Sequence, residues 1–185
     1  TAVVSNVGQI LGQCEDYNYL IFPAVIHDIN KFIDLMLRVE KNGIWIQHVP
    51  CRYLVSIRAL KIAISLAVRD FVRGENIARK LNIQILLRLF GRTQVREVLR
   101  LVGNEDGLYV VLILCRDDPR NILEELKGRI SSISWDRCKP NLDEVMGLYS
   151  ISRDLLDLMA MRGYDIIDVV ERLVIERIAT AHLFK

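Results

Sequence analysis

The spacing of hydrophobic and polar residues predicts helices and strands that alternate along the first two thirds of the chain. Runs of β-branched and aromatic residues, or apolar residues at every second position, predict strands, whereas apolar residues every three or four positions predict helices. The predicted strands span 17–26, 44–49, 83–90 and 108–115. The predicted helices span 29–41, 53–72, 76–81, 94–102, 121–127, 142–148, 153–161 and 164–183. The last third of the chain is therefore expected to be helical throughout.

Local signals support several of these boundaries. Residues whose side chains suit a helix N-cap precede three of the helices, and they are Asp28, Thr93 and Asn141. Gly74 lies just after the helix 53–72, where the left-handed conformation of a C-terminal cap favours glycine. The strand 108–115 is almost wholly apolar, which indicates a central strand that is covered on both faces.

These elements predict an α/β or α+β fold, with a small mixed or antiparallel sheet of about four strands, flanked by helices, and a helical C-terminal layer. The order of the strands stays open at this point. A length of 185 residues fits one domain that spans 1–185. Residues 1–16 are loosely patterned and are expected to form an N-terminal arm or an edge element.

The predicted helix at the C-terminal end carries two apolar stripes, whereas a helix at a domain surface needs only one. The longer stripe contains Ile167, Val170, Val174, Ile178 and Ala181. The shorter stripe contains Ile166, Val169 and Leu173. Either both stripes are buried in the core of the monomer, or one of them binds a partner protein. In the second case the expected partner-binding residues are Leu173, Val170, Ile166 and Ile178.

Positive charge is concentrated in residues 52–100. This block contains eleven Lys and Arg residues against three Asp and Glu, a net charge of +8, whereas the whole chain has a net charge of +2. Such segregation indicates a surface that meets a polyanion, with nucleic acid as the first candidate. The alternative is a solvated, ion-paired surface of a heat-stable protein.

The helix 53–72 organises part of this charge. On a helical wheel, four basic residues fall on one side, and they are Arg58, Lys61, Arg69 and Arg73. The opposite side contains Leu60, Ala63, Ala67 and Phe71. The helix is therefore expected to present a basic stripe to solvent and an apolar side to the core.

Motifs of common catalytic and cofactor-binding sites are missing. The chain contains no GxxxxGK[ST], GxGxxG, GxSxG or HExxH sequence. Its four cysteines form no CxxC pair, so no metal and no cofactor are expected. Cys115 is expected to be a core thiol, and pairing among Cys14, Cys51 and Cys138 stays open. No apolar run is long enough to cross a membrane and no signal peptide is evident, so a cytoplasmic protein is expected.

Three residues are candidates for catalysis. Asp117 and Asp118 follow the strand 108–115, where carboxylates can bind a metal or act as a base, but Asp118-Pro119 also favours a turn. His48 has no evident nucleophile beside it. We therefore expect no enzymatic activity and no small-molecule substrate. An enzyme with an unrecognised site around these three residues is the alternative.

Residues 67–95 resemble a known family. A helix ends in Arg73-Gly74 and is followed by Asn76, and the segment 91–95 matches a Gly-x-x-Gln-Ile/Val helix start. The strand 108–115 and the segments 148–151 and 173–179 match in the same order. Over roughly residues 17–183 the chain resembles the kinase-binding subunit of the archaeal KEOPS complex, the CGI-type or PRPK-binding protein family.

The resemblance implies a non-catalytic regulatory subunit. The family binds the small atypical kinase/ATPase of KEOPS through its C-terminal helices, and the complex places a threonylcarbamoyl group on the adenosine beside the tRNA anticodon. Archaeal members are similar to proteins that grip the single-stranded 3′ CCA end of tRNA.

The basic block fits such a role, because arginine neutralises phosphates and stacks on unpaired bases. The residues expected to form the pocket for the RNA tail are Arg73, Asn76, Arg79, Arg92 and Gln94. The residues expected to extend it electrostatically are Arg69, Lys61 and Arg58. The alternative is a kinase-binding scaffold with no RNA role, in which the basic block forms ion pairs.

Overall fold

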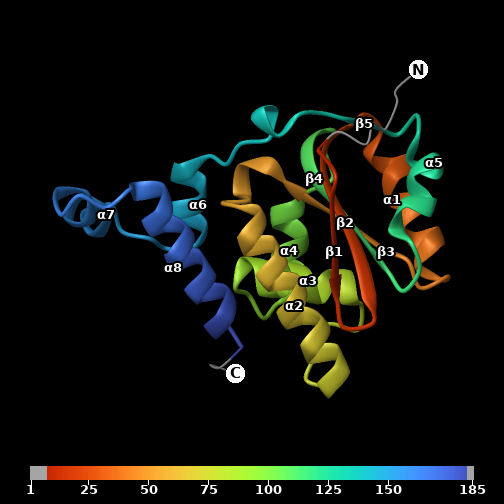
Figure 1. The fold of residues 1–185 in the computed structure, drawn as a ribbon, viewed down its shortest axis with the longest axis horizontal. Coiled ribbons are helices and arrows are strands. Elements are labelled where there is room, and N and C mark those ends of the chain that lie inside the picture. Colours follow the sequence, from red (N-terminus) through yellow and green to blue (C-terminus); the bar gives the residue numbers. More distant parts are fainter. Residues whose placement is uncertain (1–7, 183–185) are drawn as a thin grey trace. The chain divides into compact units, whose positions relative to one another are not determined.

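The computed structural model describes residues 8–182 and divides them into two compact units (Figure 1). One unit contains residues 8–51 and 102–139 and is called the sheet unit here. The other contains 52–101 and 140–182 and is called the helical unit. Each unit is thus assembled from two segments that are far apart in the sequence. The prediction of one domain spanning 1–185 stays a prediction.

The sheet unit contains five antiparallel strands. They are β1 (Ile10–Cys14), β2 (Tyr17–Ile26), β3 (Trp45–Pro50), β4 (Gly107–Cys115) and β5 (Ile130–Ser132). Four of them are ordered β1-β2-β4-β3, and β5 pairs with the last three residues of β2. The predicted α/β or α+β class with a small antiparallel sheet is confirmed. The apolar strand β4 is central, as expected, and β1 supplies the predicted edge element.

One face of this sheet packs against two helices, α1 (Ile29–Glu40) and α5 (Leu123–Leu126), which lie side by side in Figure 1. The short 3₁₀ turn η2 (Pro119–Ile122) leads into α5. Alternate residues of β2 and β4 join the apolar face of α1, including Phe22, Val111 and Phe32, all fully buried. Asp28 caps α1 as predicted, since its Oδ1 accepts a hydrogen bond from Lys31 N at 3.0 Å. The Asp28–Lys31 contact therefore fixes where the helix begins.

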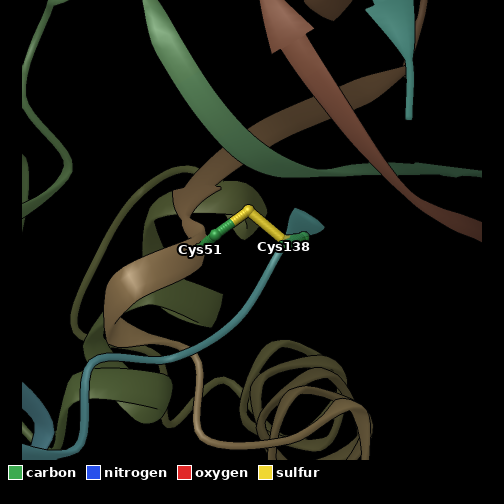
Figure 2. Close-up of a disulfide and its surroundings, with 2 residues drawn as sticks. All are labelled: Cys51 and Cys138. Carbon is green, nitrogen blue, oxygen red and sulfur yellow. A yellow bond between two sulfur atoms is a disulfide. The ribbon is translucent and has the colours of Figure 1, made fainter. Parts of the chain in front are cut away.

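A disulfide joins two distant segments of the sheet unit (Figure 2). Cys51 follows β3 directly, and Cys138 follows the 3₁₀ turn η3 (Trp135–Arg137). The two cysteines are 87 residues apart in the sequence. Cys115 is a buried free thiol, as predicted, and Cys14 is free and half-buried. The pairing that sequence reasoning left open is thus Cys51 with Cys138.

The helical unit contains η1 and six helices, although two of these elements cross its boundary by one residue. They are η1 (Cys51–Tyr53), α2 (Ile57–Arg73), α3 (Leu81–Phe90), α4 (Val95–Val102), α6 (Leu142–Leu148), α7 (Arg153–Met161) and α8 (Ile166–Thr180). The helix α2 packs against α3 and α8, and α8 also packs against α3 and α7. The predicted helical C-terminal layer corresponds to α6, α7 and α8.

The prediction of a strand at 83–90 is wrong, because these residues belong to α3. The helix is buried on almost every side, so its sequence is nearly all apolar and has no clear period. Three of its residues are polar, and two of them, Gln84 and Arg88, are four positions apart and therefore lie on one side of a helix. Both donate hydrogen bonds to Asp70. The segment 76–80, predicted as part of a helical turn, has no regular structure.

Three further helix boundaries differ from the predictions. The helix α2 begins at Ile57 and not at residue 53, because Ser56 caps it with a 3.1 Å hydrogen bond from Ala59 N. The helix α4 begins at Val95, because Glu97 N and Val98 N both donate to the carbonyl of Gln94, at 3.1 and 3.4 Å, so that Gln94 and not Thr93 precedes the helix. The helix α8 begins at Ile166 after the N-cap Asp165. The predicted end of that helix, at residue 183, lies outside the described residues, as do residues 1–7 of the predicted arm.

The disulfide is expected to contribute substantially to stability. It closes a loop of 87 residues, and cross-linking a long loop lowers the entropy of the unfolded chain. Replacing both Cys51 and Cys138 with Ala should lower the free energy of unfolding by about 2–4 kcal/mol. Urea unfolding measures this change, with Cys14→Ala as the control that leaves the disulfide intact. Equal stabilities of the double variant and the control would contradict the prediction.

His48 is buried in the core of the sheet unit. Its ring lies edge-on between Phe32 and Tyr109, with ring centroids 5.4 and 5.0 Å away. Burial lowers the pKa of His48 to about 4, against a smaller opposing effect of the Gly103 backbone. The folded state therefore holds this ring neutral at pH values where the unfolded chain already binds a proton.

This histidine should make the protein less stable in mild acid. Between about pH 6.5 and 4 the unfolded state binds one more proton at this position than the folded state does. The free energy of unfolding therefore decreases as the pH is lowered, by up to about 1.4 kcal/mol per pH unit. His48→Leu should flatten that slope in chemical unfolding measured from pH 7 to 4. A slope of the same steepness in the variant would assign the pH dependence to other groups.

Candidate functional sites

The basic stripe predicted on α2 is exposed in the structure. Its four residues, Arg58, Lys61, Arg69 and Arg73, all face solvent. On the opposite side Leu60, Ala63 and Ala67 are fully buried, and Phe71 is half-buried. The amphipathic pattern of the sequence therefore placed the stripe correctly.

Ion pairs account for only part of the basic block. Four of its arginines contact carboxylates, and they are Arg52 with Glu144, Arg58 with Glu171, Arg88 with Asp70 and Arg92 with Glu97. Among residues 8–182, six other members of the block have no ion-pair partner, and they are Lys61, Arg69, Arg73, Arg79, Arg96 and Arg100. The alternative of a surface held together by ion pairs therefore leaves more than half of this charge unexplained.

A cavity of about 420 Å³ opens beside this stripe, between α2 and the C-terminal end of α8. The charged residues that line it are Arg69, Asp70, Arg73, Glu75 and Arg88, and the other lining residues are His182, Leu66 and Ala179. Two predicted RNA-binding residues, Arg69 and Arg73, thus lie at one cavity. Nδ1 of His182 lies 3.7 Å from Oδ2 of Asp70 at this cavity.

The charge of Asp70 is neutralised inside this site. Arg88 donates two hydrogen bonds to its carboxylate, from Nε at 2.7 Å and from Nη2 at 2.5 Å. Burial by itself raises the pKa of Asp70, but the hydrogen bonds from Arg88 and Gln84 outweigh it, so the pKa is lowered. Asp70 therefore stays ionised and paired, and its charge does not cancel that of the exposed arginines.

The predicted pocket formed jointly by Arg73, Asn76, Arg79, Arg92 and Gln94 is not assembled. Asn76 and Arg79 precede the N-terminal end of α3, whereas Arg92 and Gln94 follow its C-terminal end. A helix of ten residues separates these groups by about 15 Å. Arg92 is also occupied, because Nη2 donates to the Leu148 carbonyl at 2.6 Å. Sequence reasoning placed a strand over 83–90 between these two groups, and the structure places the helix α3 there.

Most of the longer apolar stripe of α8 faces the core of the helical unit, whereas its first residue, Ile167, is exposed. Val170, Val174 and Ile178 are fully buried, so the partner-binding role predicted for Val170 and Ile178 does not fit this conformation. The other two predicted partner residues, Ile166 and Leu173, are half-buried. They remain candidates for the edge of a contact surface.

A different apolar surface is exposed where α7 leads into α8. Five large hydrophobic side chains of residues 155–167 are 40–86% exposed, and they are Leu155, Leu158, Met161, Tyr164 and Ile167. We call this set the α7–α8 apolar surface. Several large hydrophobic side chains exposed along one segment are typical of a protein-binding site. Sequence reasoning missed it, although Met161 and Tyr164 flank the turn at Arg162-Gly163, where apolar residues have no core to enter.

The segment that carries this surface is also acidic. Residues 153–168 contain four aspartates against two arginines. Two of the aspartates, Asp154 and Asp157, are exposed on α7, and Asp165 and Asp168 are exposed at the start of α8. Arg153 forms an ion pair with Asp143. The surface therefore suits a partner that offers apolar side chains with lysine or arginine around them.

The three residues considered for catalysis do not converge. His48 pairs in register with Val111 on β4, whereas Asp117 lies six residues further along the chain, beyond the end of β4 and about 20 Å away. Asp118 caps η2 and pairs with Arg120 at 2.6 Å, which lowers the pKa of this carboxyl to about 2. Within residues 8–182 no cluster of metal-ligating side chains and no helix able to span a membrane is found.

Comparison with known proteins identifies the family. A search of curated proteins finds no match. The model of the family described as kinase binding protein CGI-121 matches residues 30–182. This range covers α1 to α8, including the basic stripe and the α7–α8 apolar surface. The chain therefore belongs to the CGI-121 family of kinase-binding proteins.

Proposed function

We propose that this protein binds a protein kinase through the α7–α8 apolar surface. The observation that carries the proposal is the exposure of five large hydrophobic side chains on α7, the turn after it and the start of α8, in a member of a kinase-binding family. Leaving such side chains in water is unfavourable, and covering them releases about 25 cal/mol per Å² of apolar area. Burial by a partner therefore supplies the driving force for association.

We further propose that the kinase is the small atypical kinase/ATPase of the KEOPS complex and that this chain is a non-catalytic regulatory subunit in tRNA threonylcarbamoylation. The resemblance in the segments 67–95 and 173–179 supports this finer assignment. The scattering of His48, Asp117 and Asp118 supports a role without catalysis. The acidic residues in the segment that carries the apolar surface favour a kinase surface that carries lysine or arginine.

A second proposed function is binding of the single-stranded 3′ CCA end of tRNA. The specific observation that favours it is the cavity of about 420 Å³ beside Arg69 and Arg73, on the face that also carries Lys61. Exposed cations without ion pairs are free to neutralise phosphates, and a cavity next to them offers room for an unpaired base. The kinase and the RNA would thus use different parts of the helical unit.

Kinase binding should depend on the α7–α8 apolar surface. Leu158→Asp should weaken affinity for the KEOPS kinase at least tenfold, because it places a charge at a contact that must lose its water. Isothermal titration calorimetry measures the change. The control is Leu37→Asp in α1, since Leu37 is 52% exposed and Leu158 is 48% exposed. Equal affinities of the two variants would locate the kinase contact elsewhere.

RNA binding should depend on the stripe of α2. Arg73→Glu should weaken binding of whole tRNA, and combining it with Arg69→Glu should weaken that binding further. Neither change should alter the affinity for the kinase. Each lost phosphate contact lowers the slope of log affinity against log salt by about 0.7 for a single strand. Filter binding at several salt concentrations, with tRNA that has or lacks its CCA end, measures both effects.

The control for this experiment is Arg116→Glu, which changes an exposed arginine of the sheet unit outside the basic block. If Arg116→Glu and Arg73→Glu reduce affinity equally, only the overall charge matters and the proposed site is wrong. If wild-type affinity does not depend on the CCA end, the proposed tail recognition is wrong.

A further inference from the structure

We propose that Gln84 is a positioning residue for RNA binding: it fixes the loop 75–80 so that Arg79 is held in place beside the end of α2. The proposal rests on the RNA-binding function proposed above and adds a buried determinant to it. Gln84 is fully buried, so it cannot touch RNA itself. Its effect on affinity must therefore act through the loop.

Every polar atom of the Gln84 side chain is used. Its Oε1 accepts hydrogen bonds from the backbone N–H groups of Ile77 and Ala78, each at 3.0 Å. Its Nε2 donates to Oδ2 of Asp70 at 2.6 Å. One side chain of α3 thus connects the loop that precedes α3 to the helix α2.

The acceptor that anchors Gln84 is itself held firmly. Arg88, one helical turn after Gln84 on α3, donates two hydrogen bonds to the Asp70 carboxylate. The backbone carbonyl of Asp70 also accepts from Glu75 N at 2.8 Å, at the start of the loop. The loop is therefore attached at Glu75 through the backbone of Asp70 and at Ile77 and Ala78 through Gln84.

The loop needs these attachments because it has no regular structure of its own. Between Gly74 and Leu81 the chain forms neither helix nor strand, and within the loop Asn76 Nδ2 donates to the Ala78 carbonyl at 2.9 Å. Ala78 is buried, whereas the next residue, Arg79, is exposed. Fixing Ala78 therefore fixes the position from which the Arg79 side chain reaches solvent.

Holding the loop in advance should raise affinity for RNA. An unattached loop of six residues would lose conformational entropy on binding, and that loss opposes association. The number of phosphate contacts would not change, because the same arginines are present. Loss of the attachment should thus lower affinity while the salt dependence keeps its slope, which distinguishes positioning from loss of a contact.

The test is Gln84→Met, which keeps the length of the side chain and removes all three hydrogen bonds. We expect amide hydrogen exchange at Ile77 and Ala78 to become at least tenfold faster, measured by NMR. We expect affinity for whole tRNA to fall about three- to tenfold with an unchanged salt slope, and affinity for the kinase to stay the same. The control is Val174→Ala, a buried change in α8 that is expected to lower stability without touching the loop.

Two results would overturn the proposal. Unchanged exchange at Ile77 and Ala78 would mean that Gln84 does not hold the loop. Faster exchange with unchanged tRNA affinity, while Arg73→Glu weakens binding, would mean that loop order does not affect RNA binding. If wild-type protein binds no tRNA at all, the RNA function itself fails, and the exchange data still decide whether Gln84 anchors the loop.

Discussion

The buried ion pair between Asp70 and Arg88 organises the helical unit. Removing both charges from water costs several kcal/mol, and the pair is tolerable only because its geometry is bidentate and Gln84 adds a third hydrogen bond. Together these contacts join α2 to α3. The basic stripe lies on α2, the loop 75–80 connects α2 to α3, and both Asp70 and Arg88 line the cavity beside Arg73.

In the helical unit, α8 lies between the basic stripe and the apolar surface, because it packs against α2 and α3 as well as against α7. One side of α8 is buried against α2 and α3 through Val170, Val174 and Ile178, next to the helix that carries the basic stripe. Its N-terminal end continues from the turn after α7, where the apolar surface is exposed. In the two proposed functions a polyanion and an apolar partner bind at opposite ends of the same helix, so neither has to displace the other.

Much of this organisation follows from local sequence signals, and the failures have identifiable causes. The strands β2 and β4, the cap at Asp28 and the stripe on α2 were predictable because their signals are periodic or local. The helix α3 was not, because a segment buried on nearly all sides has no polar face to reveal its period. The partner for Cys51, 87 residues away, and the exposure of Met161 depend on tertiary packing, which spacing along the chain does not encode.

The disulfide between Cys51 and Cys138 also divides the polypeptide topologically. All of the basic block, from residue 52 to residue 100, lies inside the covalent ring that it closes, whereas α6, α7 and α8 lie in the tail outside that ring. A single backbone cleavage inside the ring leaves every fragment attached to the rest of the molecule. After a cleavage just beyond Cys138, the helices α7 and α8, which form the apolar surface, stay attached to the rest of the molecule by noncovalent contacts alone. While the disulfide is formed, the basic stripe thus stays covalently attached after one such cleavage inside the ring, whereas the α7–α8 apolar surface loses its covalent attachment when the chain is cut just after Cys138.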